Sequence, residues 1–133
     1  MRNIIYALLI FAVAGSITGC ANAPVYNVEQ HPLPIEAKRL TDQEIGQRIS
    51  QAVSRRDWNC VRTCPKTLIC HLDKRTHKAV VQVDYNHEYF SINYVKSTNL
   101  KYEGGNIHPK YNQWIRNMEG DIVKAIHQKP CCE

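Results

Sequence analysis

The side chains with the widest chemical range in this sequence are its six cysteines. Cys60 and Cys64 lie close together, His71 follows them, and Cys131 and Cys132 are adjacent near the end. Thiolate and imidazole groups are soft ligands that suit copper or zinc, so one hypothesis is a metal or thiol-redox site. The Cys-x-x-x-Cys spacing, however, is neither the redox Cys-x-x-Cys nor a paired zinc-knuckle pattern. The sequence therefore predicts no metal and no cofactor.

The alternative chemistry for Cys60, Cys64, Cys131 and Cys132 is a set of two disulfides, which an oxidising compartment favours. The adjacent pair near the end would then join the tail to segment 60–64, and three pairings remain open. A bridge from the tail to this segment would close a loop of about seventy residues, worth roughly 4 kcal/mol in the chain-entropy treatment. Cys70 alternates with leucines on an apolar face, so we interpret it as a small core hydrophobe.

A second group of polar and aromatic residues surrounds the segment between the last predicted strand and the last predicted helix. Serine, histidine and asparagine beside aromatic rings could form a ligand or partner surface, or a nucleophile–base pair. The same residue types also suit turns, helix caps and the edge of a core. We find no Gly-x-Ser-x-Gly elbow, paired carboxylates or glycine-rich phosphate loop, so no enzyme activity and no catalytic residue is predicted. The group comprises Tyr94, Ser97, Asn99, Tyr102, His108, Tyr111, Asn112 and Trp114.

The first element that could position these residues is a helix with a strong start signal. Thr41 can cap its amino terminus, and Glu44 completes a capping box three residues later. Leu40 and Ile45 can form a hydrophobic staple across the same turn. Apolar residues then recur on one helical face, so a helix is predicted from residue 42 to about residue 56.

The next elements show a period of two rather than 3.6, which predicts antiparallel strands over 58–62, 67–73, 78–85 and 89–95. Leu68, Cys70 and Leu72 share one face of the second strand, so one face of the sheet is apolar. A helical apolar stripe predicts a second helix from Pro109 to about Gln128. We therefore expect an α+β fold, a two-layer sandwich in which an N-terminal and a C-terminal helix pack on one face of an antiparallel three- to four-stranded meander.

The first twenty residues follow the pattern of an exported bacterial protein. A basic start at Arg2 leads into an apolar run over 4–13 and then into small residues. The last four resemble a lipobox: Ile17, Thr18, Gly19 and Cys20. The resemblance implies that 1–19 is a cleaved signal peptide and that Cys20 receives diacylglycerol and a further acyl chain such as palmitate. A membrane-spanning helix, which needs ~20 apolar residues, and an ordinary secretory signal both fit less well.

Lipidation would place the protein in the bacterial cell envelope, with the lipid bilayer as a partner through acylated Cys20. Two or more acyl chains anchor a protein stably, because each buried methylene contributes about 0.8 kcal/mol. In the sorting behaviour that this pattern resembles, aspartate after the lipidated cysteine retains a lipoprotein in the inner membrane. Ala21 therefore implies an outer-membrane location facing the periplasm.

The segment over 20–39 has neither helical nor strand periodicity and contains Pro24, Pro32 and Pro34. We interpret it as the lipidated cysteine and a flexible tether, followed by a single α+β domain over 40–133. The 17 Lys and Arg residues less Arg2, set against 12 Asp and Glu, leave a net charge of +4. This excess is compatible with an anionic surface nearby but is more typical of a solvated basic surface. The scattered cations predict no nucleic-acid binding.

Segments spread over 56–115 resemble a family of small proteobacterial lipoproteins of unknown function. The resemblance rests on Trp58, 77–79, 91–94, 97–100, 107–108, 111–112 and Trp114, and it covers most of the predicted domain. It implies the architecture, supplies no activity, and implies that the cysteines at 60, 64, 131 and 132 are additions in this chain. We expect a protein-interaction or assembly module with an unidentified envelope partner, or alternatively a small-ligand or metal-binding Cys/His protein, in an oligomeric state that remains open.

Overall fold

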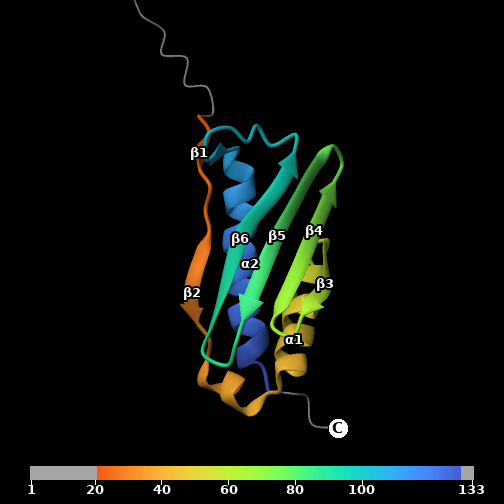
Figure 1. Cartoon of the computed structure of the whole chain (residues 1–133), viewed down its shortest axis with the longest axis vertical. Helices are drawn as coiled ribbons and strands as arrows, with labels where there is room; N and C mark the ends of the chain where they lie inside the picture. The colour runs from red at the N-terminus through yellow and green to blue at the C-terminus, as the bar shows by residue number, and fades with distance from the viewer. Residues whose placement is uncertain (1–20, 130–133) are drawn as a thin grey trace, which may run out of the picture.

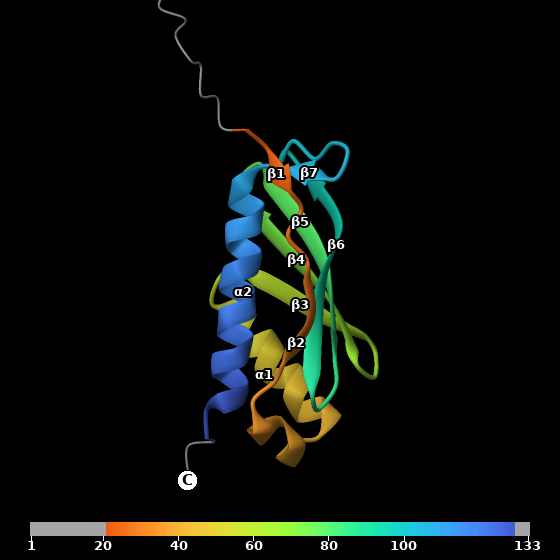
Figure 2. The same cartoon turned by 90° about the vertical axis from the view of Figure 1, so that its left-hand side faces the viewer.

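The computed structural model describes residues 21–129 (Figure 1). Two helices, α1 (Asp42–Ser54) and α2 (Pro109–His127), cover one face of an antiparallel sheet (Figure 2). A two-residue strand pair lies beside this sheet, and a short 3-10 helix, η1 (Ile35–Arg39), precedes α1. The predicted two-layer α+β sandwich is confirmed. The strands are β1 (Ala23–Pro24), β2 (Val28–Pro32), β3 (Trp58–Cys64), β4 (Thr67–Lys74), β5 (His77–Tyr85), β6 (Tyr89–Thr98) and β7 (Asn106–Ile107).

The main sheet has the order β2-β6-β5-β4-β3, so its last four strands in sequence form the predicted antiparallel meander. Both the first and the last residue of each of these strands lie within three residues of the predicted bounds. The sheet has five strands rather than three or four, because β2 pairs with β6 and sets Val28 opposite Ile92. The additional strand β2 is therefore one edge of the sheet, and β3 is the other.

The prediction of a flexible tether up to residue 39 is wrong for 23–39, which form β1, β2 and η1. Val28 and Ala37 are 3% and 0% exposed, so this segment contributes to the core. Its prolines are compatible with strand structure because β2 is an edge strand, where a missing N–H costs no ladder bond. Cys20 and the predicted signal peptide over 1–19 lie outside the described residues.

Helix α1 begins as its sequence predicts. The Thr41 hydroxyl accepts a hydrogen bond from the Glu44 backbone N–H at 3.2 Å, and the Glu44 carboxylate accepts one from the Thr41 N–H at 2.7 Å. The Thr41 backbone N–H, and after it the Thr41 side chain, lower the pKa of Glu44 because they hydrogen-bond to its carboxylate. One turn later, a side chain at Gly46 would collide with the hydroxyl of Tyr85, so glycine lets α1 approach β5 closely.

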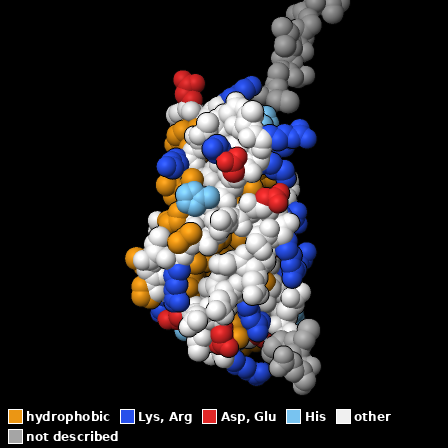
Figure 3. Space-filling model, turned by 90° about the vertical axis from the view of Figure 1, so that its right-hand side faces the viewer, with side chains coloured by type: hydrophobic (Ala, Val, Ile, Leu, Met, Phe, Trp, Pro, Cys, Tyr) orange, Lys and Arg blue, Asp and Glu red, His pale blue; other side chains and the backbone are white. Residues whose placement is uncertain are grey.

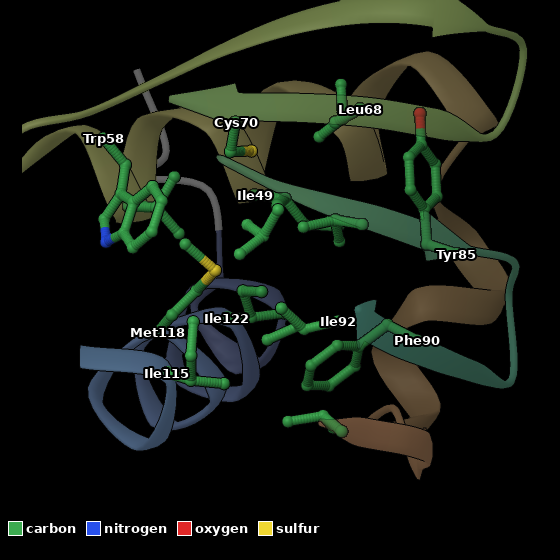
Figure 4. Close-up of a cluster of buried hydrophobic side chains, with 14 of the residues drawn as sticks. Ile49, Trp58, Leu68, Cys70, Tyr85, Phe90, Ile92, Ile115, Met118 and Ile122 are labelled. Atoms are coloured by element: carbon green, nitrogen blue, oxygen red, sulfur yellow. The ribbon is translucent and has the colours of Figure 1, made fainter. Parts of the chain in front are cut away.

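The core lies between the sheet and the two helices (Figure 4). Ile49 from α1 and Ile115, Met118 and Ile122 from α2 are fully buried against the apolar strand face. Alternation holds as predicted on the strands, where residues 68, 70 and 72 of β4 are buried and their neighbours are more exposed. The opposite face of the sheet has no helix over it in the described chain, and this leaves both a sheet face and a strand edge accessible (Figures 1 and 2).

Candidate functional site

The cysteines do not pair as the sequence analysis predicts. Cys60 of β3 forms a disulfide with Cys70 of β4, and the two residues are directly opposite each other in the strand register. Cys70 is fully buried, as expected, but it is not a free thiol. The missed signal is symmetry: both cysteines lie five residues from Pro65 in the turn between the strands, so an antiparallel hairpin must bring them together.

Each of the three predicted pairings uses Cys60, so none of them forms. Cys64 has no disulfide partner among the described residues and is exposed, whereas Cys131 and Cys132 lie outside them. Within 21–129, no three His, Cys, Asp or Glu side chains are placed to hold a metal ion. His71, the proposed partner of these cysteines, projects from the opposite face of β4 to Cys70.

Part of the predicted polar and aromatic group does assemble. The Tyr94 ring stacks on Tyr102 with centroids 4.5 Å apart and meets Tyr111 edge-on at 5.6 Å. The hydroxyls of Tyr94 and Ser97 lie 2.9 Å apart. The Tyr111 hydroxyl is buried without a hydrogen-bond partner in the described chain, and this burial raises the pKa of Tyr111. The four residues pack together as an aromatic cluster at the core edge.

The remaining members of that group serve local structure elsewhere. His108 caps α2, its Nδ1 accepting a hydrogen bond from the Lys110 N–H at 3.1 Å. Asn112 accepts a hydrogen bond from the Tyr26 N–H at 2.9 Å, and its side-chain amide donates one to the Pro24 oxygen at 2.8 Å. It therefore holds the N-terminal segment onto α2.

Asn99 and Trp114 meet His77 rather than Ser97. The His77 Nδ1 lies 2.8 Å from the Asn99 backbone oxygen, and the His77 ring lies 6.4 Å from the Trp114 ring, edge-on. No hydrogen bond joins Ser97 to a histidine within residues 21–129. The nucleophile–base pair considered from the sequence is therefore not formed by these side chains.

A different candidate site lies at the edge strand β3. Among the described strands β3 pairs only with β4, so one side of its backbone has no strand neighbour. The side chains of β3 divide between two faces: Cys60 and Arg62 turn toward the helix layer, and Val61 turns to the open sheet face, where it is 57% exposed. An edge strand of this kind is a template for pairing with another chain.

The Cys60–Cys70 pair shows which backbone groups of β3 are left over. In an antiparallel ladder, opposite residues alternate between pairs that exchange two hydrogen bonds and closer pairs that exchange none. The Cα atoms of Cys60 and Cys70 are 4.0 Å apart, which indicates the pair without hydrogen bonds. The backbone N–H and C=O of Cys60 therefore point away from β4, and the two-residue period gives those of Arg62 the same direction.

A cleft of about 500 Å³ runs beside this backbone edge, between β3 and α1. Gly46 lines the cleft on the helix side, and Leu68 of β4 lines it on the sheet side. Amide and hydroxyl groups dominate the helix wall; because they can both donate and accept hydrogen bonds, they suit peptide groups and short polar side chains. We call this cleft and the adjoining backbone the edge groove, lined by Gln43, Gly46, Gln47, Ser50, Gln51, Cys60, Arg62 and Leu68.

Figure 3 faces the β3 edge and shows how the surface divides around it. Hydrophobic side chains (orange) gather on the left, the sheet side, whereas Lys and Arg side chains (blue) follow the right-hand margin, on the helix side. The periodicity of α1 predicts one apolar face, but the sequence does not place the polar face of this helix beside a strand edge. That placement depends on the position of β3 in the sheet order.

Comparisons of the chain with protein-family models, with curated proteins and with solved structures find no significant match. The resemblance to a lipoprotein family therefore stays a prediction. Across the described residues, no helix has both the length and the apolar character that crossing a bilayer requires.

Proposed function

We propose that this chain is a lipid-anchored interaction module of the bacterial cell envelope that binds an extended segment of a partner protein in the edge groove. The observation that carries the proposal is the coincidence of a free strand edge with a polar cleft on its helix side. The anchoring part is supported by the lipobox-like residues that end at Cys20. A periplasm-facing position at the outer membrane follows from the same signal and from Ala21.

Strand addition explains how this geometry would generate affinity. An extended segment lying along β3 can exchange hydrogen bonds with the outward N–H and C=O groups of Cys60 and Arg62, each bond contributing about 1 kcal/mol. Alternate side chains of that segment would enter the edge groove or lie beside Val61, and these side chains supply specificity. The Gln47 and Ser50 side chains favour small polar residues at the buried positions.

The disulfide fits this role because it lies within the recognition edge. It joins β3 to β4 at Cys60, whose backbone groups point away from β4, so the register of the edge is fixed before binding. A preformed edge costs less conformational entropy on association than one that must order first. The cross-link therefore supports binding as well as stability.

Site-specific photocrosslinking of the full chain in its membrane tests the proposal. A photoreactive residue at Val61 reports on the edge, and the same residue at Val95, 47% exposed on the sheet surface, is the matched control. We expect a discrete crosslinked partner from position 61 and at least tenfold less from position 95. Equal yields from both positions, or none from position 61, contradict the edge groove as a docking site.

Two variants of Arg62 identify the type of contact. Arg62→Pro removes an N–H that β4 does not use, whereas Arg62→Gln removes the same charge and keeps the N–H. Strand addition predicts that binding of the captured partner is lost in the proline variant and retained in the glutamine variant. As a check independent of folding, the partner should slow hydrogen exchange at the amides of Cys60 and Arg62 in the unaltered chain. Replacing Cys20 by serine should separately abolish incorporation of radiolabelled palmitate.

A further inference from the structure

The helix layer contains a second hollow, a groove of about 610 Å³ between α1 and α2. The two helices are antiparallel here, because Arg48 donates a hydrogen bond to the Gln128 backbone oxygen at 2.7 Å and Arg56 donates one to Asp121 at 2.5 Å. We call it the basic groove after its five cationic side chains: Arg48, Arg55, Arg56, Lys124 and Lys129.

The groove exists because both helices present the same spacing of residues. Helix α1 with its C-cap residue presents positions 48, 51, 52 and 55, and α2 with its C-cap residue presents 121, 124, 125 and 128. Each therefore contributes positions i, i+3, i+4 and i+7. The i+4 position is an alanine in both cases, Ala52 and Ala125. Among the described residues, these two alanines are the only apolar side chains that line the groove, and its other lining residues are polar or charged.

Most of the net charge of the chain is concentrated in this groove. Its five cations face one carboxylate, that of Asp121, which leaves a net charge of +4 from the lining residues. The whole chain carries +5. The remainder of the sequence is therefore close to neutral, and the scattered excess expected from the sequence is instead gathered between two helices that lie far apart in the chain.

Partners among residues 21–129 do not neutralise this charge. Asp121 is held by Arg56 through contacts of 2.5 and 3.4 Å, and a nitrogen of Arg48 satisfies carbonyl oxygens at the end of α2 while keeping its positive charge. In the described part of the chain, no carboxylate lies within 4.0 Å of Arg55, Lys124 or Lys129. These three cations are available to a ligand.

We propose that the basic groove binds a soluble linear polyanion that carries successive phosphate groups. Arg48 and Arg55 lie two helical turns apart, about 10.5 Å along the axis, so a ligand with repeated anionic groups can contact both at once. Guanidinium groups bind phosphate oxygens through paired hydrogen bonds. Within the described chain, the lining contains no hydrophobic side chain larger than alanine, which disfavours an amphipathic helix of a protein partner as the occupant.

The position of the groove distinguishes a soluble polymer from the headgroups of the anchoring membrane. The carboxyl end of α2 lies at the opposite end of the molecule from β1, where the described chain begins (Figures 1 and 2). Under the proposed anchoring through Cys20, the part of the groove at the end of α2 would therefore lie at the end of the domain distant from the lipidated residue. This step rests on the proposed function, whereas the charge and shape of the groove do not.

Binding of a fluorescent inorganic polyphosphate to the full chain, held in neutral detergent, tests the proposal without any partner protein. Arg55→Gln combined with Lys124→Gln removes two groove cations that have no carboxylate partner among residues 21–129. Arg75→Gln combined with Lys110→Gln removes the same two charge types from exposed sites outside the groove. We expect the groove variant to bind about tenfold more weakly, with the slope of log affinity against log salt reduced by about 1.4 to 1.8, and the control to change less than threefold.

The outcomes separate the possible occupants. Equal weakening in both double variants would mean general charge attraction and would overturn the proposal. If oligoglutamate binds as tightly as polyphosphate, the ligand class is an acidic protein segment. If the chain binds only phosphatidylglycerol vesicles, the ligand is a membrane surface. Either result overturns the assignment to a soluble phosphate polymer. Absence of polyphosphate binding overturns it too, and none of these results affects the edge-groove crosslinks.

Discussion

Removing the Cys60–Cys70 disulfide should lower the stability of the protein by an amount that follows from its place in the chain. The cysteines are separated by 10 residues. The chain-entropy relation for a loop of this length gives about 9 cal/mol/K, or about 2.7 kcal/mol at 25 °C. Replacing both cysteines by alanine also removes a sulfur that is fully buried at Cys70, which adds on the order of 1 kcal/mol.

The expected shift is large enough to measure directly. Unfolding entropies of about 2.1 cal/mol/K per residue over roughly 110 folded residues convert 2.7 kcal/mol into a fall in Tm of about 12 °C. Urea and thermal unfolding of the full chain, with and without a reductant, provide the measurement. Reductant should destabilise the unaltered chain by about 2.7 kcal/mol and leave the double-alanine variant unchanged. Cys64→Ser is the matched control, because Cys64 is exposed and unpaired among the described residues.

Three results would refute this reasoning. One is a loss below about 0.5 kcal/mol in the double-alanine variant, because a cross-linked hairpin cannot be that weak under the entropic relation. A second is rapid alkylation of Cys60 in the native, unreduced protein. The third is equal destabilisation by Cys64→Ser, which would place the stabilising bond elsewhere.

The remaining predictions concern packing, the N-terminal segment and pH. Gly46→Ala should destabilise the protein by about 1–3 kcal/mol in urea unfolding, because its methyl group meets the Tyr85 hydroxyl. Asn112→Ala should lower the free energy of unfolding by about 2 kcal/mol and speed hydrogen exchange over 23–32, because it leaves the Tyr26 N–H and the Pro24 C=O without this hydrogen-bond partner. The lowered pKa of Glu44 means that its carboxylate stabilises the fold above pH 4.5, and this contribution is lost as the pH falls below that value. Glu44→Gln should therefore reduce the fall in stability on acidification, measured by urea unfolding at several pH values.

Each of these predictions has a control and a contradicting result. Tyr85→Phe removes the colliding oxygen, so Gly46→Ala should cost less in that background; an unchanged cost contradicts the steric explanation. For Asn112, Gly120→Ala alters α2 at a site with open space around it and should leave exchange over 23–32 unchanged. If the unaltered chain and Glu44→Gln lose stability in parallel between pH 6 and pH 3, the carboxylate of Glu44 does not contribute as described.

Elements whose signals lie within a few neighbouring residues can be predicted from this sequence. The capping box needs only Thr41 and Glu44, and both hydrogen bonds form. The apolar stripe of α2 and the alternation on β4 likewise depend on spacing along one element. Such signals are local because helix and strand periodicity is a property of the backbone itself. They correctly placed two helices on one face of an antiparallel meander.

The N-terminal segment shows where local reasoning ends. Residues 23–39 have no periodic pattern, and their prolines favour an extended chain, so nothing nearby in the sequence indicates packing. Their partners are distant: β2 pairs with β6, and Asn112 binds the backbone at Pro24 and Tyr26. An edge strand with few apolar residues becomes ordered only when a neighbour supplies the hydrogen bonds and the burial.

The candidate sites followed the same division. The sequence determined that Cys60 and Cys70 flank a turn and that Arg48 and Arg55 share a helical face. It also placed Ala125 within the second helix. Only the tertiary structure decided that the cysteines are cross-strand partners and that β3 is an edge. It also decided that cationic residues of the two helices line one groove together with two alanines. The physical reason is range: backbone periodicity and capping act over a few residues, whereas sheet order, register and helix packing depend on contacts between segments far apart in the chain.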